Sequence, residues 1–320
     1  MSSYNILFIG DPVPELKPGK ETTLALIFEA QNRRFQVDYC TAKDLCLTNG
    51  RVIGLVRPIT LNENLDDHIH MGDESAKNLE RYDIIVLRSN PDGYKRMNTS
   101  YILDALADKV FITNDPRGIR ELHGKYFISN FPDFIVPYAI VESAGHLEHF
   151  LKNHSDVIIK PVNGFGGNGV KRLKSKPQDI QQYFEDTYKE YGESPFIVQE
   201  YIKDAVKGDK RIIMFGGEPI CSILRVPQCE NSLANVTQGA TVEASELTLR
   251  EQALCRELGP IMKDYGLFFV GIDMLGDYMT ELNVISVGTI VPANTLYNIK
   301  LEETFWDKLL DEYEHFKKSA

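Results

Sequence analysis

Hydrophobic and polar stretches alternate along the first 115 residues, and they predict strands and helices in turn. Continuous apolar stretches predict buried strands at residues 4–9, 37–40, 82–87 and 110–113. Helical spacing predicts helices at residues 22–31 and 100–106, with Thr22 or Thr23 as the N-cap of the first. Strands that alternate with helices indicate an open α/β sheet. Ligands bind beyond the carboxyl ends of such strands, here near Asp11 and Arg88.

The pattern changes after residue 121, where the chain predicts short strands and hairpins instead. These strands are expected at residues 134–136, 157–160, 196–199, 210–215, 219–226, 268–275 and 278–284. Gly216-Gly217 and Gly276-Asp277 lie where hairpins turn, and an amphipathic helix over residues 248–265 ends at Gly266. The second part of the chain is therefore predicted to have an α+β organisation.

A cluster of glycines interrupts the stretch VIIKPVNGFGGNGVKRL, residues 157–173. Its members are Gly164, Gly166, Gly167 and Gly169. Glycines let backbone amides approach a phosphate closely, but a glycine turn after a strand is also common architecture. The stretch lacks the Gly-Lys-Ser/Thr of a P-loop, and residues 170–173 alternate like a strand rather than opening a helix. The predicted arrangement is strand, glycine flap, strand.

Lys160 ends the apolar strand that precedes the flap and is followed directly by Pro161. A long cation in this place either pairs with an anion or extends its ammonium group to solvent. Both readings stay open from the sequence.

The stretch GIDMLGDYMTELNVIS, residues 271–286, carries oxygen ligands on a hairpin. Glu281 and Asn283 are two residues apart, so their side chains share a face of the strand. A three-residue loop over residues 275–277 would place Asp273 on that face as well. Carboxylates and amide oxygens suit Mg²⁺, although ordinary polar residues on the outside of a hairpin would give the same pattern.

Charge and composition narrow the class of function. The net charge of -11 argues against binding along a nucleic-acid backbone, which needs a basic surface. No apolar run approaches the roughly 18 residues of a membrane span, and the start MSSYNILFIG lacks the features of a signal peptide. The 5 cysteines are scattered without C-x-x-C pairs. We therefore expect a cytoplasmic protein without disulfides or a zinc site.

Some chemically reactive side chains have simpler interpretations. His68 and His70 could share a strand face and bind a metal, but a solvated acidic loop is the favoured reading. Nothing near Cys229 in the sequence would lower the pKa of its thiol. Trp306 is expected in the core.

Taken together, these motifs resemble the ATP-grasp ligases, and among them the bacterial glutathione synthetase type. The resemblance extends over almost the whole chain and is carried by these segments in order: DPVPELKPGKETTLALIFEAQ, HGKYF, IIKPVNGFGGNGV, VQEYIKDAVKGDKRI, GGEPICSILRVPQ and FFVGIDMLGDYMTELNV. It implies an ATP-grasp fold preceded by an open α/β domain. The implied boundaries are an N-terminal substrate-side domain at 1–121, a subdomain with the glycine flap at 122–200, and a subdomain with the metal site at 201–320.

The resemblance also implies roles for individual residues. Lys125 and Lys160 would contact the phosphates of ATP under the flap, and Asp209 would reach the ribose. The segment of Gln199, Glu200, Tyr201 and Ile202 would bind the adenine. Asp273, Glu281 and Asn283 would hold two Mg²⁺ ions, with Mn²⁺ as a possible substitute. Arg211 and Arg225 would face the γ-phosphate and the carboxylate that it activates.

The implied reaction is ATP-dependent formation of a peptide-like amide through an acyl phosphate, in the family's case from γ-glutamylcysteine and glycine. ATP supplies a good leaving group to a carboxylate that is otherwise a poor electrophile, and arginine and magnesium neutralise charge on the transferring phosphoryl group. The partners are small molecules, and the family analogy suggests a homo-oligomer.

Three segments depart from the family pattern, and all three concern the substrates. In segment 228–240, Leu233 stands where the family has a second arginine, while Asn235 and Gly239 remain. Segment 286–292 lacks the family's arginine, and segment 88–94 reads RSNPDGY without the usual Pro-Pro pair. An unpaired buried carboxylate is costly, so losing cations changes which carboxylate a pocket accepts. The sequence therefore leaves the identity of the joined substrates open.

Two other classes of function remain as alternatives. One is a nucleotide-binding protein without catalysis, which the intact set of cations and carboxylates disfavours. The other is a phosphotransferase on the same fold, which would need a base to activate a hydroxyl group; no such residue is evident.

Overall fold

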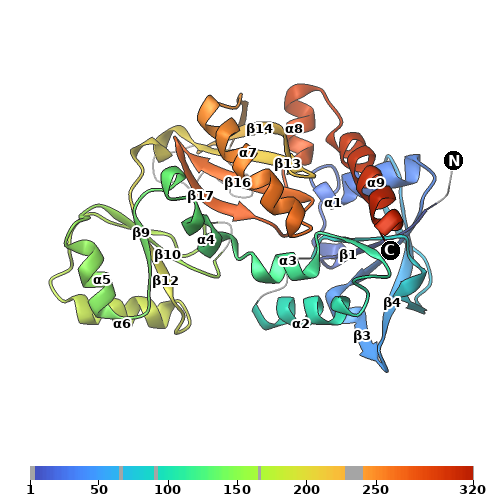
Figure 1. Ribbon diagram of the computed structural model, residues 1–320, viewed down its shortest axis with the longest axis horizontal. Coiled ribbons are helices and arrows are strands. Elements are labelled where there is room, and N and C mark those ends of the chain that lie inside the picture. Colours follow the sequence, from blue (N-terminus) through green and yellow to red (C-terminus); the bar gives the residue numbers. More distant parts are fainter. Residues whose placement is uncertain (1–3, 65–67, 90–92, 165–166, 228–240, 320) are drawn as a thin grey trace.

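The computed structural model describes residues 4–64, 68–89, 93–164, 167–227 and 241–319. Within them the chain forms three sheets, each with its own helices (Figure 1). Gly166 and the segment 228–240, including Cys229, Leu233, Asn235 and Gly239, lie outside the described residues, as do residues 90–92 of the segment 88–94.

The N-terminal sheet has four parallel strands at its centre, as the alternating pattern predicts. In spatial order they are β2 (Gln36–Thr41), β1 (Asn5–Gly10), β7 (Ile84–Leu87) and β8 (Phe111–Thr113). Antiparallel strands extend the sheet beyond β2, namely β4 (Arg51–Leu61), β3 (Leu45–Thr48), β5 (Ile69–Met71) and β6 (Ser75–Asn78). The helices here are α1 (Thr22–Asn32), α2 (Gly93–Asp104) and α3 (Pro116–Glu121).

A small antiparallel sheet of four strands follows, reached through the short helix α4 (Gly124–Phe127). Its order is β11 (Lys171–Leu173), β10 (Val157–Pro161), β12 (Phe196–Glu200) and β9 (Tyr138–Val141). Helices α5 (Ala144–Leu151) and α6 (Ile180–Glu190) pack on it through a separate core that includes Leu147, Phe184 and Phe196 (Figure 1).

The third sheet has five antiparallel strands and lies between the other two parts of the molecule (Figure 1). Its order is β15 (Thr241–Ala244), β14 (Glu218–Val226), β13 (Asp209–Phe215), β16 (Phe269–Leu275) and β17 (Tyr278–Asn283). The helices that follow in the C-terminal part are α7 (Leu249–Asp264), α8 (Ile290–Tyr297) and α9 (Leu301–Ser319).

The C-terminal helix α9 returns to the N-terminal sheet and completes its core. Trp306 is fully buried there, as expected, and its Nε1 donates to the carbonyl oxygen of Leu26 at 2.9 Å. One apolar cluster joins side chains of β1 and α1 with Phe215 of β13 and Phe305 of α9. The N-terminal domain and the five-stranded sheet therefore share a core.

Two local predictions are wrong. Residues 134–136 do not form a strand: Pro132–Phe134 is a 3-10 helix, and the strand β9 begins only after Pro137, whose ring nitrogen cannot donate to a ladder. The N-cap of α1 is Glu21 rather than a threonine. Thr22 and Thr23 lie in the first turn, where their hydroxyls accept hydrogen bonds from the Ile290 amide and from the Arg88 side chain.

Candidate active site

The strands of the five-stranded sheet bring together charged residues that lie far apart in the sequence. Arg211 on β13 pairs in register with Asp273 on β16, and Asp273 in turn pairs with Glu281 on β17. Asp209 and Arg225 form the corresponding pair between β13 and β14. Because side chains alternate between faces, these register pairs place both arginines and the carboxylates on one face of the sheet.

A β-bulge sets the position of Asp273. The hairpin loop holds two residues, Gly276 and Asp277, rather than the three that would align the ligands by loop length alone. The register shifts between Asp273 and Met274, so that Thr280 is left without a partner in the pairing and Asp273 faces Glu281. The expected alignment of Asp273, Glu281 and Asn283 is therefore present, but it is produced by the bulge.

The Asp273 carboxylate is the centre of this cluster. Arg211 binds it with two nitrogen atoms, and its Nη2 lies 2.8 Å from Oδ2. Arg225 Nη2 lies 3.0 Å from Oδ1 and also pairs with Asp209. The Asn283 amide donates to Asp273 Oδ2 at 3.1 Å. The bidentate, charge-assisted contact fixes the Arg211 guanidinium in direction as well as in position. Arg225 contacts Asp273 and Asp209 through Nη2 alone.

The pKa values of the two aspartates in the cluster, Asp273 and Asp209, shift in opposite directions. Burial would raise the pKa of Asp273, but Arg211 and Arg225 outweigh it and lower that pKa below the usual range. Burial raises the pKa of Asp209, and the neighbouring Asp273 charge raises it further. Burial also raises the pKa of Glu281. Asp273 therefore carries the firmly fixed negative charge, while Asp209 and Glu281 are sensitive to any cation that approaches.

The donor atoms suit a hard cation such as Mg²⁺. Asp273 and Glu281 provide carboxylate oxygens and Asn283 an amide oxygen on adjacent strands. Within the described part of the chain, Asp209 Oδ1 is buried and has no hydrogen-bond partner, as expected of an oxygen that a bound cation or hydroxyl group would satisfy. No group of three or more His, Cys, Asp or Glu positioned for a metal occurs among the described residues, so a metal here depends on Asn283 or on oxygens of a bound ligand.

Two lysines line the site from the side of the small sheet. Lys125 is buried, and its Nζ donates to the carbonyl oxygens of Pro161, at 3.3 Å, and of Gly164. The same nitrogen lies 3.9 Å from Glu281 Oε1. Burial lowers the pKa of Lys160 to about 8, against the opposing charge of Glu281. Lys160 is half-buried at the end of β10 and lies in the electrostatic field of the Glu281 carboxylate.

The glycine stretch contacts Lys125 at Gly164 and Tyr191, the residue after α6, at Gly169. A Cβ atom on Gly164 would lie 2.5 Å from the Pro161 ring, which excludes any side chain in this conformation. Gly169 has a φ of +75°, and the Tyr191 hydroxyl donates to its carbonyl oxygen. Gly167 also has a positive φ. These glycines form the predicted connection between β10 and β11.

The segment from Gln199 to Ile202 leaves the small sheet towards the five-stranded one. Gln199 and Ile202 are buried, whereas Glu200 is exposed and lies 3.3 Å from His154 Nδ1. The Tyr201 amide donates to the Asp156 carbonyl oxygen at 3.0 Å. The segment follows β12 and leads through the 3-10 helix Lys203–Lys207 into β13 of the five-stranded sheet.

A cavity of about 100 Å³ adjoins the charged cluster. Among its lining residues, Lys125, Gly164, Glu281 and Asn283 belong to the predicted site. Arg96 and His123 line it as well, although nothing in their spacing distinguishes them in the sequence. Arg96 comes from α2 of the N-terminal domain, so only the packing of α2 against the rest of the chain brings it here.

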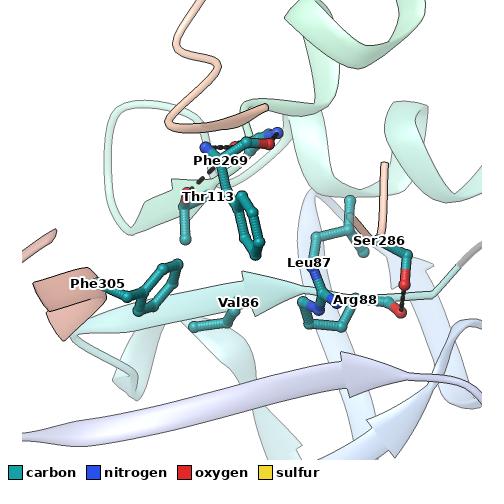
Figure 2. A pocket seen from close by; sticks show the side chains of 8 residues that line it. Val86, Leu87, Arg88, Thr113, Phe269, Ser286 and Phe305 are labelled. Atoms are coloured by element: carbon teal, nitrogen blue, oxygen red, sulfur yellow. Dashed lines mark hydrogen bonds between the residues drawn. The ribbon is translucent and has the colours of Figure 1, made fainter. Parts of the chain in front are cut away.

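Arg88, at the carboxyl end of β7, is used as an anchor between domains. Its Nη2 donates to the Val287 carbonyl oxygen at 2.8 Å, and its guanidinium lies 5.3 Å from the centre of the Phe269 ring. Figure 2 shows the Ser286 hydroxyl beside Arg88, to whose carbonyl oxygen it donates at 2.9 Å. Burial lowers the pKa of Arg88 to about 10. Arg88 thereby fixes the segment 286–288 to the N-terminal sheet.

His68 and His70 lie at the edge strand β5 and just before it. His68 Nδ1 contacts the Asn62 carbonyl oxygen, and His70 Nε2 lies 2.7 Å from the Asn62 amide. The loop interpretation is wrong for His70, because Ile69–Met71 is a strand in which His70 pairs with Thr60 of β4. Both histidines contact Asn62, and they belong to no group of metal-binding side chains among the described residues.

Family models cover most of the chain. The model for the prokaryotic glutathione synthetase N-terminal domain matches residues 4–120, and that for the prokaryotic glutathione synthetase ATP-grasp domain matches residues 124–298.

Similar proteins along most of the chain are named glutathione synthetases. A glutathione synthetase of Mesorhizobium japonicum is 32% identical over 93% of this chain and 95% of its own. That of Brucella melitensis is 33% identical over 90% of this chain and 92% of its own. That of Escherichia coli O6:H1 is 32% identical over 86% of this chain and 88% of its own.

Solved structures share the fold at low sequence identity. D-cycloserine synthetase DcsG superposes with a TM-score of 0.67 at 12% identity, covering 97% of this chain and 100% of its own. The ATP-grasp ligase PsnB gives 0.60 at 16% identity, covering 97% and 98%.

None of the described helices is long and apolar enough to cross a membrane. The two family models together cover residues 4–120 and 124–298, and each of the three relatives covers at least 86% of the chain. The chain therefore belongs to the prokaryotic glutathione synthetase family and is an ATP-dependent ligase with an ATP-grasp fold.

Proposed function

We propose that this protein joins γ-glutamylcysteine to glycine with hydrolysis of ATP to ADP and phosphate. The observation that carries the proposal is the cluster of Arg211, Arg225 and Asp273, which lies beside Glu281 and Asn283 and faces Lys125. Two guanidinium groups next to oxygen donors suit a reaction in which a phosphoryl group passes to a carboxylate. The names of the relatives supply the substrates.

The reaction proceeds in two steps. A carboxylate oxygen of the first substrate attacks the γ-phosphorus of ATP, the bond to ADP breaks, and an acyl phosphate forms. The amine of the second substrate then attacks the acyl carbon, phosphate leaves, and the amine loses a proton as the amide forms. Arg211 and Arg225 stabilise the negative charge on the transferring phosphoryl oxygens in the first step and orient the carboxylate.

The remaining site residues bind the nucleotide. Lys125 and Lys160 contact the phosphates, with Gly164, Gly166, Gly167 and Gly169 covering them. Gln199, Glu200, Tyr201 and Ile202 bind the adenine, and Asp209 binds the ribose. Asp209 also contacts Arg225, the arginine proposed to face the γ-phosphate.

The family uses ATP with Mg²⁺, and we assign the metal to Asp273, Glu281 and Asn283. Two Mg²⁺ ions, or Mn²⁺ in their place, supply positive charge at the phosphate oxygens when bound. Arg211 holds the Asp273 carboxylate in place from the neighbouring strand, and the Asn283 amide contacts its second oxygen.

A covering segment over the acyl phosphate is useful because water would otherwise hydrolyse this intermediate. Lys125 ties the start of the glycine stretch to the floor of the site through the carbonyl oxygens of Pro161 and Gly164. The chain's own backbone can therefore close the site.

A second candidate is a ligase of the same mechanism that joins a different carboxylate and amine. The observation that favours it is the absence of arginine from segment 286–292, where Val291 stands on α8. Cations that hold a substrate carboxylate set which substrate binds.

Further proposals concern the setting of the enzyme. Cys40, Cys46, Cys221 and Cys255 are free thiols, which supports a reducing compartment such as the cytoplasm. We retain a homo-oligomer by analogy with the family, and a division of the chain near residues 121 and 200.

The test is to incubate the protein with MgATP, γ-glutamylcysteine and glycine and to measure phosphate release together with the mass of the product. Glutathione and phosphate in equal amounts are expected. Phosphate release with another pair of substrates but not with this one would replace the first candidate with the second. No ADP with any pair of carboxylate and amine would contradict both.

A further inference from the structure

The two faces of the four-stranded sheet are turned to different parts of the molecule. One face packs on α5 and α6, and its buried side chains are Val157, Ile159, Phe196 and Val198. Side chains alternate between the faces of a strand, so Ile158 and Lys160 of β10 lie on the other face. Lys160 lies in the field of the Glu281 carboxylate of β17, so this second face is turned towards the five-stranded sheet.

One row of side chains crosses the second face where the adenine is proposed to bind. Arg172 of β11 pairs in register with Ile158, and Ile158 pairs with Gln199 of β12. Directly opposite residues of antiparallel strands share a face, so these three side chains lie in one row. The row is two residues from Lys160, or about 7 Å along β10. A nucleotide that lies along this strand with its phosphates at Lys160 would bring its base to the row.

Contacts on two sides hold Arg172 in one direction. Its Nε lies 2.8 Å from Asp156 Oδ1 and its Nη2 lies 2.6 Å from Asp156 Oδ2, so the pair is bidentate. Its guanidinium carbon lies 3.3 Å from the centre of the Tyr201 ring, where a cation is attracted to the aromatic face. The Asp156 carbonyl oxygen in turn accepts from the Tyr201 amide at 3.0 Å. Each of the three residues therefore contacts the other two.

These contacts act at the middle of the segment 199–202. Tyr201 follows the last residue of β12 and lies two residues before the 3-10 helix Lys203–Lys207. The Arg172 and Asp156 side chains remain partly exposed, and an exposed ion pair alone contributes little. Here the pair is bidentate, a ring covers one face of the guanidinium, and the backbone of Asp156 is bonded to Tyr201. Together these contacts fix the path of the backbone at Tyr201.

We propose that Arg172 is a positioning residue for binding of the nucleotide base. It holds the Tyr201 ring and thereby fixes the segment 199–202 in the conformation that receives the base. The inference rests on the proposed function, which assigns this segment to the adenine. Because Arg172 acts through Tyr201, its loss should weaken nucleotide binding only as far as Tyr201 carries the effect.

The experiment is a double-mutant cycle on nucleotide affinity. Calorimetric titration with AMPPNP and Mg²⁺ gives Kd for the wild type, Arg172→Met, Tyr201→Leu and the double variant. We expect Kd to rise about three- to tenfold in each single variant, the size of a cation–π contact with a paired guanidinium. The double variant should bind no more than about twofold more weakly than the weaker single variant, because both substitutions break the same contact. Tyr201→Phe keeps the ring and should bind as the wild type does.

Lys174→Met is the matched control, because it removes a cation from an exposed position two residues after Arg172. It should leave Kd unchanged, and the midpoint of urea unfolding shows that each variant is folded during the titration. Effects that multiply in the double variant, or an equal loss in Lys174→Met, would overturn the inference.

The same titrations separate the role of Arg172 from the proposals on which it rests. A loss of affinity in Tyr201→Leu alone would overturn the role of Arg172 while the adenine assignment stands. An unchanged Kd in both single variants would contradict the adenine assignment and the inference together. Neither γ-glutamylcysteine nor glycine is present, so a wild type that forms no glutathione would contradict the proposed substrates and not the role of Arg172.

Discussion

The five-stranded sheet and the four-stranded sheet both line the site, but they are anchored in different ways. The five-stranded sheet shares an apolar core with the N-terminal domain, and Asn114 joins the two. The Asn114 side chain donates to the carbonyl oxygens of Phe269 and Val284 and accepts from the Phe269 amide, each at 2.8 Å. Arg88 adds a further buried link.

The four-stranded sheet packs on its own helices instead. Its core consists of residues of β9, β10, β12, α5 and α6, with Val141, Leu147 and Phe196 fully buried. Separate cores allow a part of a protein to move as a unit. The charged cluster therefore belongs to the part that shares a core with the N-terminal domain, whereas the strands that flank the glycine stretch belong to a part with its own core.

The largest effect should come from Asp273→Asn, which removes the central charge of the cluster. Arg211 loses its charged partner, Arg225 keeps only Asp209, and the proposed metal site loses a charged ligand. Turnover should fall by about 10³-fold, as measured by phosphate release.

Asp277→Asn, on the exposed turn of the same hairpin, is the matched control and should leave turnover unchanged. Activity of Asp273→Asn within a few-fold of wild type would contradict the assignment of Asp273.

Asn114→Ala tests the anchoring of the five-stranded sheet. It leaves the Phe269 amide and two carbonyl oxygens buried without this partner, so the free energy of unfolding should fall by about 2–3 kcal/mol. The midpoint of urea unfolding measures the change. Asn153→Ala, at an exposed position after α5, should change it by less than about 0.5 kcal/mol. Equal losses of unfolding free energy in Asn114→Ala and Asn153→Ala would contradict the role of Asn114 in anchoring the five-stranded sheet.

The pKa of Lys160, on the small sheet, predicts that the affinity for ATP depends on pH. Because burial lowers the pKa of Lys160 to about 8, this side chain loses its charge in the ATP-free protein as the pH rises through that value. If ATP binds the protein in which Lys160 is protonated, the affinity for ATP should be constant below about pH 8. Above that value it should fall by up to about tenfold per pH unit.

Calorimetric titration with the analogue AMPPNP between about pH 7.5 and 9.5 measures this dependence. Lys160→Gln should bind more weakly and show no such decline. A wild-type affinity that stays constant over the range would contradict a role of the charged lysine.

The smallest effect is expected from Tyr191→Phe. It removes one hydrogen bond, from the Tyr191 hydroxyl to the Gly169 carbonyl oxygen, that holds the glycine stretch against α6. KM for ATP should rise by no more than about fivefold, equivalent to about 1 kcal/mol. Tyr188→Phe keeps this bond and serves as the comparison. A loss of activity as large as that of Asp273→Asn would show that the glycine stretch is as sensitive to substitution as the charged cluster.

The sequence by itself determined the local elements and the residue types of the site. Periodicity predicts most strands and the helix over 248–265. A strand or helix that buries one face repeats its apolar residues with its own period, and even a short segment shows this repeat. Glu281 and Asn283 share a face through their spacing alone. The family resemblance added Lys125, Arg211 and Arg225, gave Lys160 a role, and implied the class of reaction.

Tertiary structure decided what spacing cannot encode. Asp273 reaches Glu281 through a bulge at Thr280, because pairing depends on both strands and not on loop length alone. Asp209 joins the cluster because β13 lies between β14 and β16. Arg96 enters the cavity only because α2 packs on α3, a contact between segments whose local patterns are independent of each other. The site is assembled from two sheets and from helices α2 and α4. The sequence therefore identifies some of its residues, whereas which residues become their neighbours depends on how these elements pack.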